Sequence, residues 1–336
     1  MTNGMKTLHA IILPLCAAAL AAACAGGAPR DASAAADTPP RAVPHFNADS
    51  AHAFCAAQCA FGPRVMNSGA HDSCAQWIAG RFRGYGLSVS MRRATLVGYD
   101  GTPLNATNIT ARLAPDKQER VLLCAHYDSR PWADNDPDTA NWRSPVPAAN
   151  DGASGVAVML ELARILSSHD SLNVGVDFVC FDAEDYGAPR WSGSLDDDDS
   201  WALGSQHWAR LARDNGYAPR FGILLDMVGG QGATFYQETF SLHYANDIVK
   251  KVWDAARRAG YSAFFPKKQG GMITDDHVPL NETAGIPTID IVPHHPDCPT
   301  SSFGATWHTV SDDMEHIDRN TLKAVGQTLV LVVCSE

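Results

Sequence analysis

Residues 121–125 have the sequence VLLCA, a short and continuous apolar run that leads directly into an HYDS motif. A run of this kind predicts a β-strand buried on both faces, as the strands of parallel sheets are. Val174–Phe181, Phe221–Val228 and Thr288–Val292 are further short segments that predict strands. The chain therefore predicts a buried, mostly parallel sheet at the centre of its fold.

Helical segments alternate with these strands along the chain. In each, apolar residues recur with the period of an α-helix, and the clearest case directly follows an NDGASG motif. Alternating strands and helices predict crossover connections and helices on both faces of the sheet. The predicted helices are Gly152–Leu166, Ala202–Ala212, Asn246–Ala259 and Asn320–Cys334.

The segment before residue 121 predicts a different arrangement. Leu87–Met91 and Ala106–Leu113 alternate polar and apolar residues, and a turn at residues 98–103 separates them. They are expected to pair antiparallel at one edge of the sheet, after a helical region at His52–Gly84 that Gly62-Pro63 interrupts. The predicted fold is an α/β, three-layer α/β/α sandwich with a mostly parallel mixed sheet and an antiparallel edge.

The first residues predict export. Residues 1–24 combine a positive charge at Lys6 with an apolar run that ends in small residues before Cys24. The end of this run resembles a bacterial lipobox, which implies a lipid anchor at Cys24 and a location in the periplasm or outer membrane. Ordinary cleavage nearby, with free release, is the alternative. Residues 25–41 predict a flexible tether, and 42–336 a single catalytic domain.

Composition limits the classes of partner. The chain has 336 residues, 45% of them hydrophobic, and a formal net charge of −11. Nothing in it resembles the basic stripe that would neutralise nucleic-acid phosphates, so no nucleic-acid partner is expected. The cysteines lack a paired CxxC spacing, which argues against a thiolate zinc site. We expect a monomer whose contact with a membrane is limited to its lipid anchor.

Acids and histidines follow the predicted strands. A lone carboxylate at such a place is more often a helix cap, as Asp151 could be. Ligands of open α/β sheets bind outside the carboxyl ends of the strands, and acids gathered there repel one another unless a cation is bound. Oxygen and imidazole groups without thiolates suit catalytic zinc. The residues are His126, Asp128, Asp151, Asp182, Glu184, Asp185, Asp226 and His308.

Six ordered motifs carry a family resemblance from about Asn105 to Asp318. They resemble those of the zinc aminopeptidase (M28-like) clan, and within it most closely the glutaminyl-peptide cyclotransferase branch. The resemblance implies a zinc-exopeptidase-like fold and a bound Zn²⁺. The motifs are HYDS at 126–129, NDGASG at 150–155, FDAED at 181–185, LLDMVG at 224–229, DDH at 275–277 and WHT at 307–309.

Matched residue by residue, the resemblance implies three groups of site residues. One group binds a single zinc, one contains the general acid/base Glu184 with two acids that hydrogen-bond around it, and one lines the substrate pocket with aromatic rings. The implied metal ligands are Asp151, Asp185 and His308, the catalytic acids are Glu184, Asp226 and Asp275, and the pocket aromatics are Trp191, Phe303 and Trp307.

The implied reaction is the cyclisation of an N-terminal glutamine. The α-amine attacks the side-chain carbonyl of the same residue, ammonia departs, and pyroglutamate remains. Zinc would polarise the carbonyl, and Glu184 would pass a proton from the amine to the leaving nitrogen. The expected partners are peptides and proteins with a free N-terminal glutamine.

Two other functions stay open. A two-zinc aminopeptidase would bind a second metal through His126 and Asp226, with Asp151 as the bridge. A non-catalytic, exported peptide-binding protein would be expected to lack Glu184 or a metal ligand, and this chain has both. Three features favour the cyclase. Asp275 is an extra acid that could hold Asp226 by a shared proton, and Trp307 lies directly before the ligand His308. Phe303 and Trp191 would give a small aromatic pocket.

Overall fold

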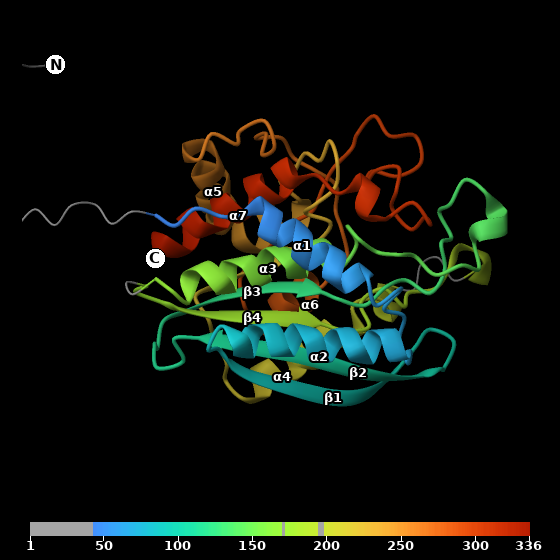
Figure 1. The fold of residues 1–336 in the computed structure, drawn as a ribbon, viewed down its shortest axis with the longest axis horizontal. Helices are drawn as coiled ribbons and strands as arrows, with labels where there is room; N and C mark the ends of the chain where they lie inside the picture. Colours follow the sequence, from blue (N-terminus) through green and yellow to red (C-terminus); the bar gives the residue numbers. More distant parts are fainter. Residues whose placement is uncertain (1–42, 170–171, 194–197) are drawn as a thin grey trace, which may run out of the picture. The chain divides into compact units, whose positions relative to one another are not determined.

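The VLLCA run forms the middle of β3 (Arg120–His126), a central strand of the sheet in Figure 1. A computed structural model describes residues 43–169, 172–193 and 198–336, and within them the sheet has six strands in the order β1-β2-β4-β3-β5-β6. The other strands are β1 (Ser88–Val97), β2 (Pro103–Leu113), β4 (Gly175–Phe181), β5 (Phe221–Leu225) and β6 (Thr288–Ile291).

The strand directions confirm the predicted mixed sheet. β3 pairs in parallel with β4 and β5, and β6 is parallel to β5. β2 is antiparallel to both β1 and β4, so the antiparallel pair forms one edge. The register places His126, the last residue of β3, opposite Phe181, the last residue of β4. The segments that follow these two strands therefore begin at the same edge of the sheet.

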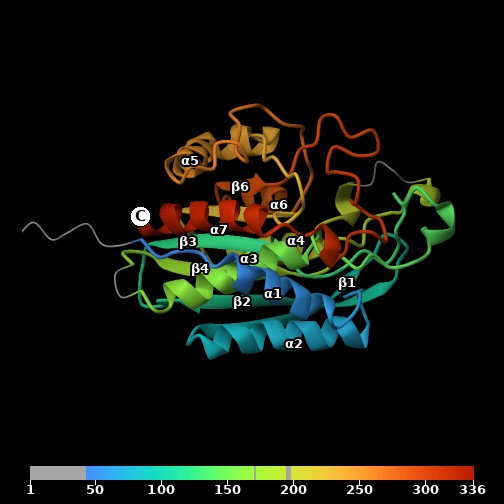
Figure 2. The same ribbon diagram turned by 45° about the horizontal axis from the view of Figure 1, so that its top comes forward.

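Helices cover both faces of the sheet, as Figures 1 and 2 show. Helices α1, α2, α3, α5 and α7 share one hydrophobic core with one face, whereas α4 and α6 pack against the other. This confirms the three-layer sandwich. The helices are α1 (Ala48–Cys59), α2 (Gly69–Gly84), α3 (Ala153–Leu166), α4 (Leu203–Asp214), α5 (Thr239–Arg258), α6 (His277–Glu282) and α7 (Arg319–Cys334).

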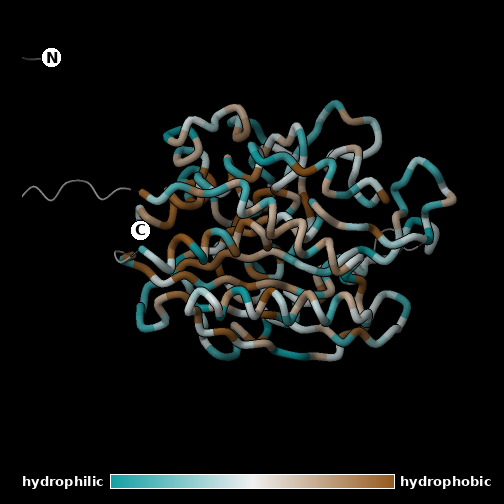
Figure 3. The backbone as a smooth tube through the Cα atoms, in the orientation of Figure 1, coloured by the Kyte–Doolittle hydropathy of each residue, from teal (hydrophilic) through white to brown (hydrophobic). Residues whose placement is uncertain are grey.

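The continuous apolar run of β3 follows from this two-sided burial. Val121, Leu123 and Ala125 belong to the core under α3 and its neighbours, while Leu122 and Cys124 belong to the smaller core under α4 and α6. Successive side chains of a strand point to opposite faces, so a strand covered on both sides needs apolar residues at every position. Figure 3 shows the hydrophobic segments concentrated on the central strands.

The described residues from Val43 to Glu336 belong to one compact unit. The signal peptide predicted for residues 1–24, its Cys24 anchor and the tether predicted for residues 25–41 lie outside the described residues. Among the helices that are described, none has the length and apolar character needed to span a membrane.

Candidate active site

The edge where the parallel strands end gathers the predicted acids and histidines. His126 ends β3, Glu184 and Asp185 follow β4, and Asp226 follows β5. Asp151 precedes α3, and His308 comes from the long connection between β6 and α7. All of these side chains are at least nine-tenths buried except that of Glu184, which is 12% exposed. The topology thus brings distant parts of the chain to one site.

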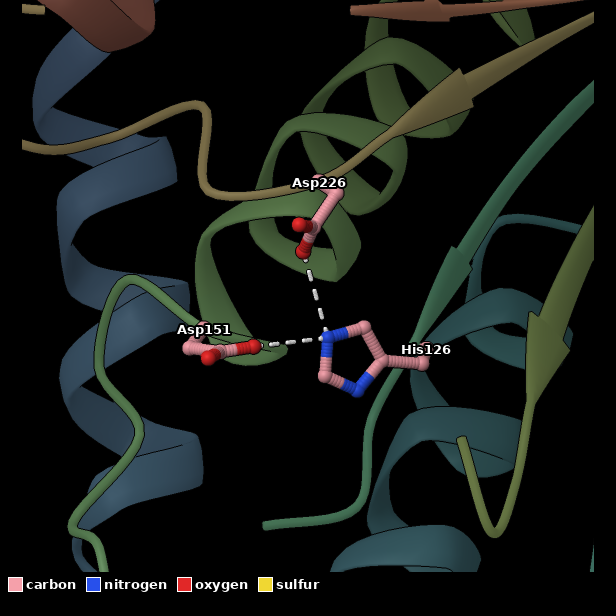
Figure 4. Close-up of side chains that lie close together, drawn as sticks. All are labelled: His126, Asp151 and Asp226. Carbon is pink, nitrogen blue, oxygen red and sulfur yellow. Dashed lines mark hydrogen bonds and ion pairs between the residues drawn. The ribbon is translucent and has the colours of Figure 1, made fainter. Parts of the chain in front are cut away.

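One group of possible metal ligands surrounds the His126 imidazole (Figure 4). Its Nε2 atom lies 3.0 Å from Asp151 Oδ1 and 3.2 Å from Asp226 Oδ1. The donor atoms of these three residues all lie within 4.8 Å of one another. This is the set that a second metal would need.

A second group consists of Asp151, Asp185 and His308. His308 Nε2 lies 3.3 Å from Asp185 Oδ1 and 3.6 Å from Asp151 Oδ2. Asp151 therefore directs one oxygen to each group and is shared by both. The structure brings together the three residues that were predicted to bind zinc.

The donor set suits a zinc ion. It contains carboxylate oxygens and imidazole nitrogens but no thiolate, as open catalytic zinc sites do. Asp185 Oδ1 accepts a hydrogen bond from Arg130 at 3.3 Å, whereas Asp185 Oδ2 is buried with no hydrogen-bond partner. A buried, unpartnered carboxylate oxygen is costly, and a cation would supply the missing partner.

Carboxylates behind the ligands fix the backbone that carries them. Asp128 accepts hydrogen bonds from the N–H groups of Glu184 and Asp185, both at 3.1 Å. Asp312 accepts from the N–H groups of Asn150 and Asp151 at 2.8 and 3.0 Å. The sequence showed Asp128 within a motif, but nothing distinguished Asp312 from the other acids of its loop.

The backbone is strained at several of these positions. His308 has a φ of 53°, Ala183 directly before Glu184 has a φ of 53°, and Met227 directly after Asp226 has a φ of 50°. Left-handed conformations at residues other than glycine are sparsely populated and concentrate at functional sites. The surrounding packing therefore holds these three residues in a backbone conformation that they would rarely adopt on their own.

The Glu184 carboxyl group has the electrostatic environment of a proton carrier. Burial raises the pKa of Glu184 well above its ordinary value, and the neighbouring acids Asp185 and Asp275 add to this effect, while His126 opposes it. Burial also raises the pKa of Asp226 to about 6, and repulsion from Asp151 and Asp185 contributes. Burial and repulsion from Asp226 raise the pKa of Asp275 to about 7. Proton affinities in this range suit general acid/base catalysis near neutral pH.

A small cavity of about 140 Å³ opens onto these acids. Its polar residues are Asp151, Glu184, Asp226, Asp275 and His308. Its aromatic walls are Trp201, Phe303 and Trp307, and Ile273, Thr274 and Met227 complete the lining. Drug-sized ligands usually occupy about 300–1,000 Å³, so this space suits a single side chain.

The aromatic walls are packed onto the site. The Trp307 and His308 rings stack with centroids 3.7 Å apart, and Phe303 lies 5.0 Å from Trp307. Trp201 also stacks on His308, with ring centroids 5.9 Å apart and an interplanar angle of 8°. Phe303 and Trp307 thus lie where the sequence predicted them.

Trp191 is not among the residues that line this cavity. Its ring stacks on Trp142 at 6.2 Å, and the Arg143 guanidinium lies 4.0 Å from its centroid. Trp201 occupies the wall for which Trp191 was predicted. A loop rich in Ser, Gly and Asp separates the two tryptophans, and the sequence contains no signal that chooses between them.

The fold and the two adjoining ligand groups define an α/β metalloenzyme of the exopeptidase type, and zinc is the metal that the family and its relatives support. The chain belongs to peptidase family M28, whose model matches residues 108–333. It is 31% identical over 220 residues to aminopeptidase YwaD of Bacillus subtilis, covering 63% of this chain and 40% of that protein. It is 25% identical over 258 residues to the glutaminyl-peptide cyclotransferase of Bos taurus, covering 68% of this chain and 65% of that enzyme.

The chain therefore spans less than two thirds of the length of either of these relatives. Solved structures match more fully. The glutaminyl cyclase of Bacteroides thetaiotaomicron has a TM-score of 0.85 and 47% identity, over 88% of this chain and all of that one. The glutaminyl cyclase of Tannerella forsythia has a TM-score of 0.84 and 49% identity, over 87% of this chain and all of that one. A structure described as a leucine aminopeptidase precursor from Bacteroides thetaiotaomicron has a TM-score of 0.84 and 47% identity. The match covers 88% of this chain and 99% of that one.

Proposed function

We propose that this protein is a zinc-dependent glutaminyl-peptide cyclotransferase that converts the N-terminal glutamine of peptides and proteins to pyroglutamate. The observation that carries the proposal is the cavity of about 140 Å³, in which Glu184 and His308 face aromatic walls formed by Trp201, Phe303 and Trp307. Cyclisation needs no second substrate, so a space for one folded glutamine side chain is sufficient. The solved structures described as glutaminyl cyclases, at 47% and 49% identity, support the same function.

Asp151, Asp185 and His308 would hold the zinc ion. When bound, zinc supplies Lewis acidity that polarises the side-chain carbonyl of the glutamine. Arg130 and Asp134 form a buried ion pair, with contacts of 2.7 and 2.8 Å, next to the Asp185 oxygen that Arg130 also contacts. This pair orients the ligand carboxylate before any metal arrives.

Glu184 would move the proton. The amine nitrogen forms a bond to the side-chain carbonyl carbon, and Glu184 takes a proton from that nitrogen. The bond from the carbonyl carbon to the side-chain nitrogen then breaks, Glu184 returns the proton to that nitrogen, and ammonia leaves. Asp226 and Asp275 line the same cavity, and the charge of Asp275 helps to raise the pKa of Glu184. The aromatic walls exclude water that would otherwise hydrolyse the amide.

The second candidate function is that of a two-zinc aminopeptidase. The specific observation in its favour is the group of His126, Asp151 and Asp226, which adjoins the first group and shares Asp151 with it. Two similar proteins support this candidate, aminopeptidase YwaD and the structure described as a leucine aminopeptidase precursor. Asp275 argues against it, because it lines the same cavity as Asp226. Burial and repulsion from Asp226 raise the pKa of Asp275 to about 7, which favours a proton among these acids over a second metal ion.

The reaction can be tested by ammonia release from the amidated peptide Gln-Ala-Ala. The zinc-loaded protein should release one ammonia per peptide, and the product should resist an enzyme that removes free N-terminal residues. Chelation of the metal should stop the release. Release of free glutamine in place of ammonia would overturn the proposed cyclisation and support the aminopeptidase.

We also propose, from the sequence before residue 43, that the protein is an exported bacterial lipoprotein anchored at Cys24. The substrates would then be exported peptides and proteins with N-terminal glutamine. Radiolabelled palmitate should be incorporated into the wild-type protein but not into Cys24→Ser. Equal labelling of the two proteins would contradict the anchor.

A further inference from the structure

One wall of the candidate active-site cavity is formed by a segment without regular structure. Ile273, Thr274 and Asp275 all line the cavity, and residues 270–274 form neither helix nor strand. Such a segment has no regular ladder of backbone hydrogen bonds to fix its position, so its polar groups need partners from other parts of the chain. We refer to residues 270–275 as the wall segment.

Glu238, directly before α5, is a buried acid that takes no part in the chemistry proposed above. Its Oε1 atom accepts from the Phe240 N–H at 2.7 Å and its Oε2 atom from the Ser241 N–H at 2.6 Å, which caps the helix. Burial would raise the pKa of Glu238, but hydrogen bonds, above all from His277, lower it overall. A neutral Ser or Asn can cap a helix without burying a charge, so capping alone does not require this carboxylate.

The same two oxygens also contact the wall segment and the residue behind it. Oε1 accepts a second hydrogen bond from the Ile273 N–H at 3.1 Å, and Oε2 lies 3.2 Å from His277 Nε2. Ile273 lies two residues before Asp275, and His277 lies two residues after it. Glu238 therefore contacts the chain on both sides of an acid that lines the cavity.

Helix α5 and strand β6 provide the fixed frame for these contacts. Ser241 Oγ donates to Glu238 Oε2 at 2.8 Å and accepts from the Asp290 N–H at 2.9 Å. Asp290 belongs to β6, which packs beside α5 and α6 (Figure 2). Next to Glu238, the Thr239 N–H donates to the Gly271 carbonyl at 2.9 Å. The carboxylate is thus attached to α5 and the sheet on one side and to the wall segment on the other.

We propose that Glu238 is a positioning residue of the candidate active site, which acts through Ile273 to hold the wall segment against the glutamine side chain. Its contact with His277 fixes the end of the same segment at Asp275. The inference rests on the proposed cyclase function and extends it to a residue that determines how well the glutamine fits. Glu238 lies outside the six sequence motifs and does not line the cavity.

Glu238→Asp separates positioning from capping. Aspartate is a preferred helix cap and keeps the charge, but its carboxylate is one methylene shorter and cannot reach the Ile273 N–H from the cap position. The KM of the zinc-loaded, full-length protein for amidated Gln-Ala-Ala should rise about three- to tenfold, the value of one hydrogen bond. A variant that is merely less stable has fewer active molecules, which lowers the apparent kcat but leaves KM unchanged. An unchanged KM would therefore overturn the proposal.

Glu238→Gln is the second variant. Glutamine keeps the length of the side chain, so its amide oxygen can still accept from the Ile273 N–H, whereas the amide nitrogen cannot replace Oε2 as an acceptor. Its KM should rise less than that of Glu238→Asp. A larger rise in the glutamine variant would mean that charge, and not the reach to Ile273, is the property that the site uses.

A double variant tests whether Glu238 acts through Ile273. Ile273→Ala removes a half-buried side chain from the wall segment and should itself raise KM. In the Ile273→Ala protein, Glu238→Asp should change KM by less than about twofold, because residues that act through one another give non-additive effects. Effects that simply multiply would show that Glu238 does not act through this side chain.

Asn47→Ala is the matched control. Asn47 caps α1 in the same pattern, accepting from the Asp49 and Ser50 N–H groups at 3.0 and 3.1 Å, and it does not line the cavity. This variant should unfold at a lower urea concentration and keep the wild-type KM. An equal rise in KM would mean that the loss of a cap alone explains the effect of Glu238→Asp.

The same assay distinguishes this inference from the function on which it rests. If the wild-type protein releases no ammonia from Gln-Ala-Ala, the proposed function fails, and the inference fails with it. If the wild type cyclises the peptide and Glu238→Asp does so with the wild-type KM, the positioning role alone is overturned.

Discussion

Among single residues, Asp185 shows most clearly that the site is suited to a cation. One of its oxygens contacts Arg130 and His308, and the other is buried without a partner. This is the environment of a carboxylate arranged for a cation. The same reasoning applies to Asp151, which belongs to both ligand groups. Burial would raise the pKa of Asp151, but its hydrogen bond to His126 and the nearby His308 lower it overall.

Removal of the Asp185 carboxylate should therefore abolish zinc binding. The zinc content of the Asp185→Ala protein is expected to be at most about one tenth of the wild-type content, because a three-residue site with one ligand missing binds zinc weakly. Metal analysis of the purified protein measures the content. Asp247→Ala, which removes an exposed carboxylate of α5, should leave the zinc content unchanged. An unaltered zinc content in Asp185→Ala would remove this residue from the ligand set.

Replacement of Glu184 should separate catalysis from metal binding. Glu184→Gln keeps the size of the side chain but cannot exchange protons, so the turnover of Gln-Ala-Ala should fall by about 10²–10⁴-fold. The zinc content should stay at the wild-type value, because Glu184 is in neither ligand group. A variant that retains most of its activity would show that another group moves the proton.

Much of this site could be predicted from the sequence, because the motifs lie at the ends of predicted strands. Parallel strands of one sheet end at the same edge, so residues at those ends come close together. Asp151, Asp185 and His308 meet as predicted. Trp201 and Asp312 could not be found in this way. Each depends on the path of a long loop, and a loop has no periodic pattern that fixes the direction of a side chain.

At the scale of elements, the turn into α3 decides the position of Asp151. Gly152 has a φ of 104°, and a side chain there would lie 2.8 Å from the Asp128 carbonyl oxygen and 3.1 Å from the His126 ring. Both the backbone conformation and the close approach require glycine. The amphipathic pattern of α3 was clear in the sequence, but this constraint was visible only as part of a motif.

Gly152→Ala should consequently destabilise the protein by about 2–4 kcal/mol and lower its zinc content. The matched control is Gly62→Ala. Gly62 has a φ of 90° but open space around it, so this change adds only the backbone strain of about 1 kcal/mol. Urea unfolding of the two variants gives the comparison. Equal losses of stability would mean that the contacts with Asp128 and His126 are easily relieved.

The start of α2 is joined to the end of β4 by a buried ion pair. His71 Nε2 lies 2.8 Å from Asp182 Oδ1, and the same carboxylate accepts hydrogen bonds from Tyr127 and from the backbone of Thr107 and Ala183. Burial would lower the pKa of His71, but the interaction with Asp182 outweighs it and raises the pKa to about 9. Asp182 thus faces the core next to α2 and holds the strand end from which Glu184 follows.

This pair predicts how stability depends on pH. The folded-state pKa of His71 lies above its unfolded value of 6.5, so its contribution is complete below pH 6.5 and is lost as the pH rises through about 9. The free energy of unfolding of the wild-type protein should decrease by about 3 kcal/mol more over this range than that of His71→Gln. Urea unfolding at both ends of the range measures it, with the exposed His243→Gln as control. Parallel decreases in wild type and His71→Gln would show that His71 is neutral when folded.

The elements themselves were largely predictable, and the exceptions have physical causes. Helix α5 was predicted only from Asn246 onward, because non-helical backbone at Ala245 divides it and the first part lacks a continuous pattern. Helix α6 has six residues and contains Pro279, so it is too short to show a period. β1 extends to Val97, beyond the predicted end at Met91, because its partly exposed residues provide little apolar contrast.

At the scale of the whole molecule, the order β1-β2-β4-β3-β5-β6 explains why the chemistry lies at one edge. The parallel strands β3, β4 and β5 end side by side, and the long connections after β5 and β6 return over that edge. The alternation of strands and helices predicted this arrangement. The sequence could not predict that the connections would close the site into a cavity of about 140 Å³.

One measurement tests the central claim most directly. The purified, zinc-loaded protein is incubated with equal amounts of Gln-Ala-Ala and Leu-Ala-Ala in the same tube, and the products are identified by mass. We predict that the glutamine peptide loses the mass of one ammonia while the leucine peptide remains intact. Release of free leucine or free glutamine would contradict the account and would mean that His126 and Asp226 hold a second metal in an aminopeptidase.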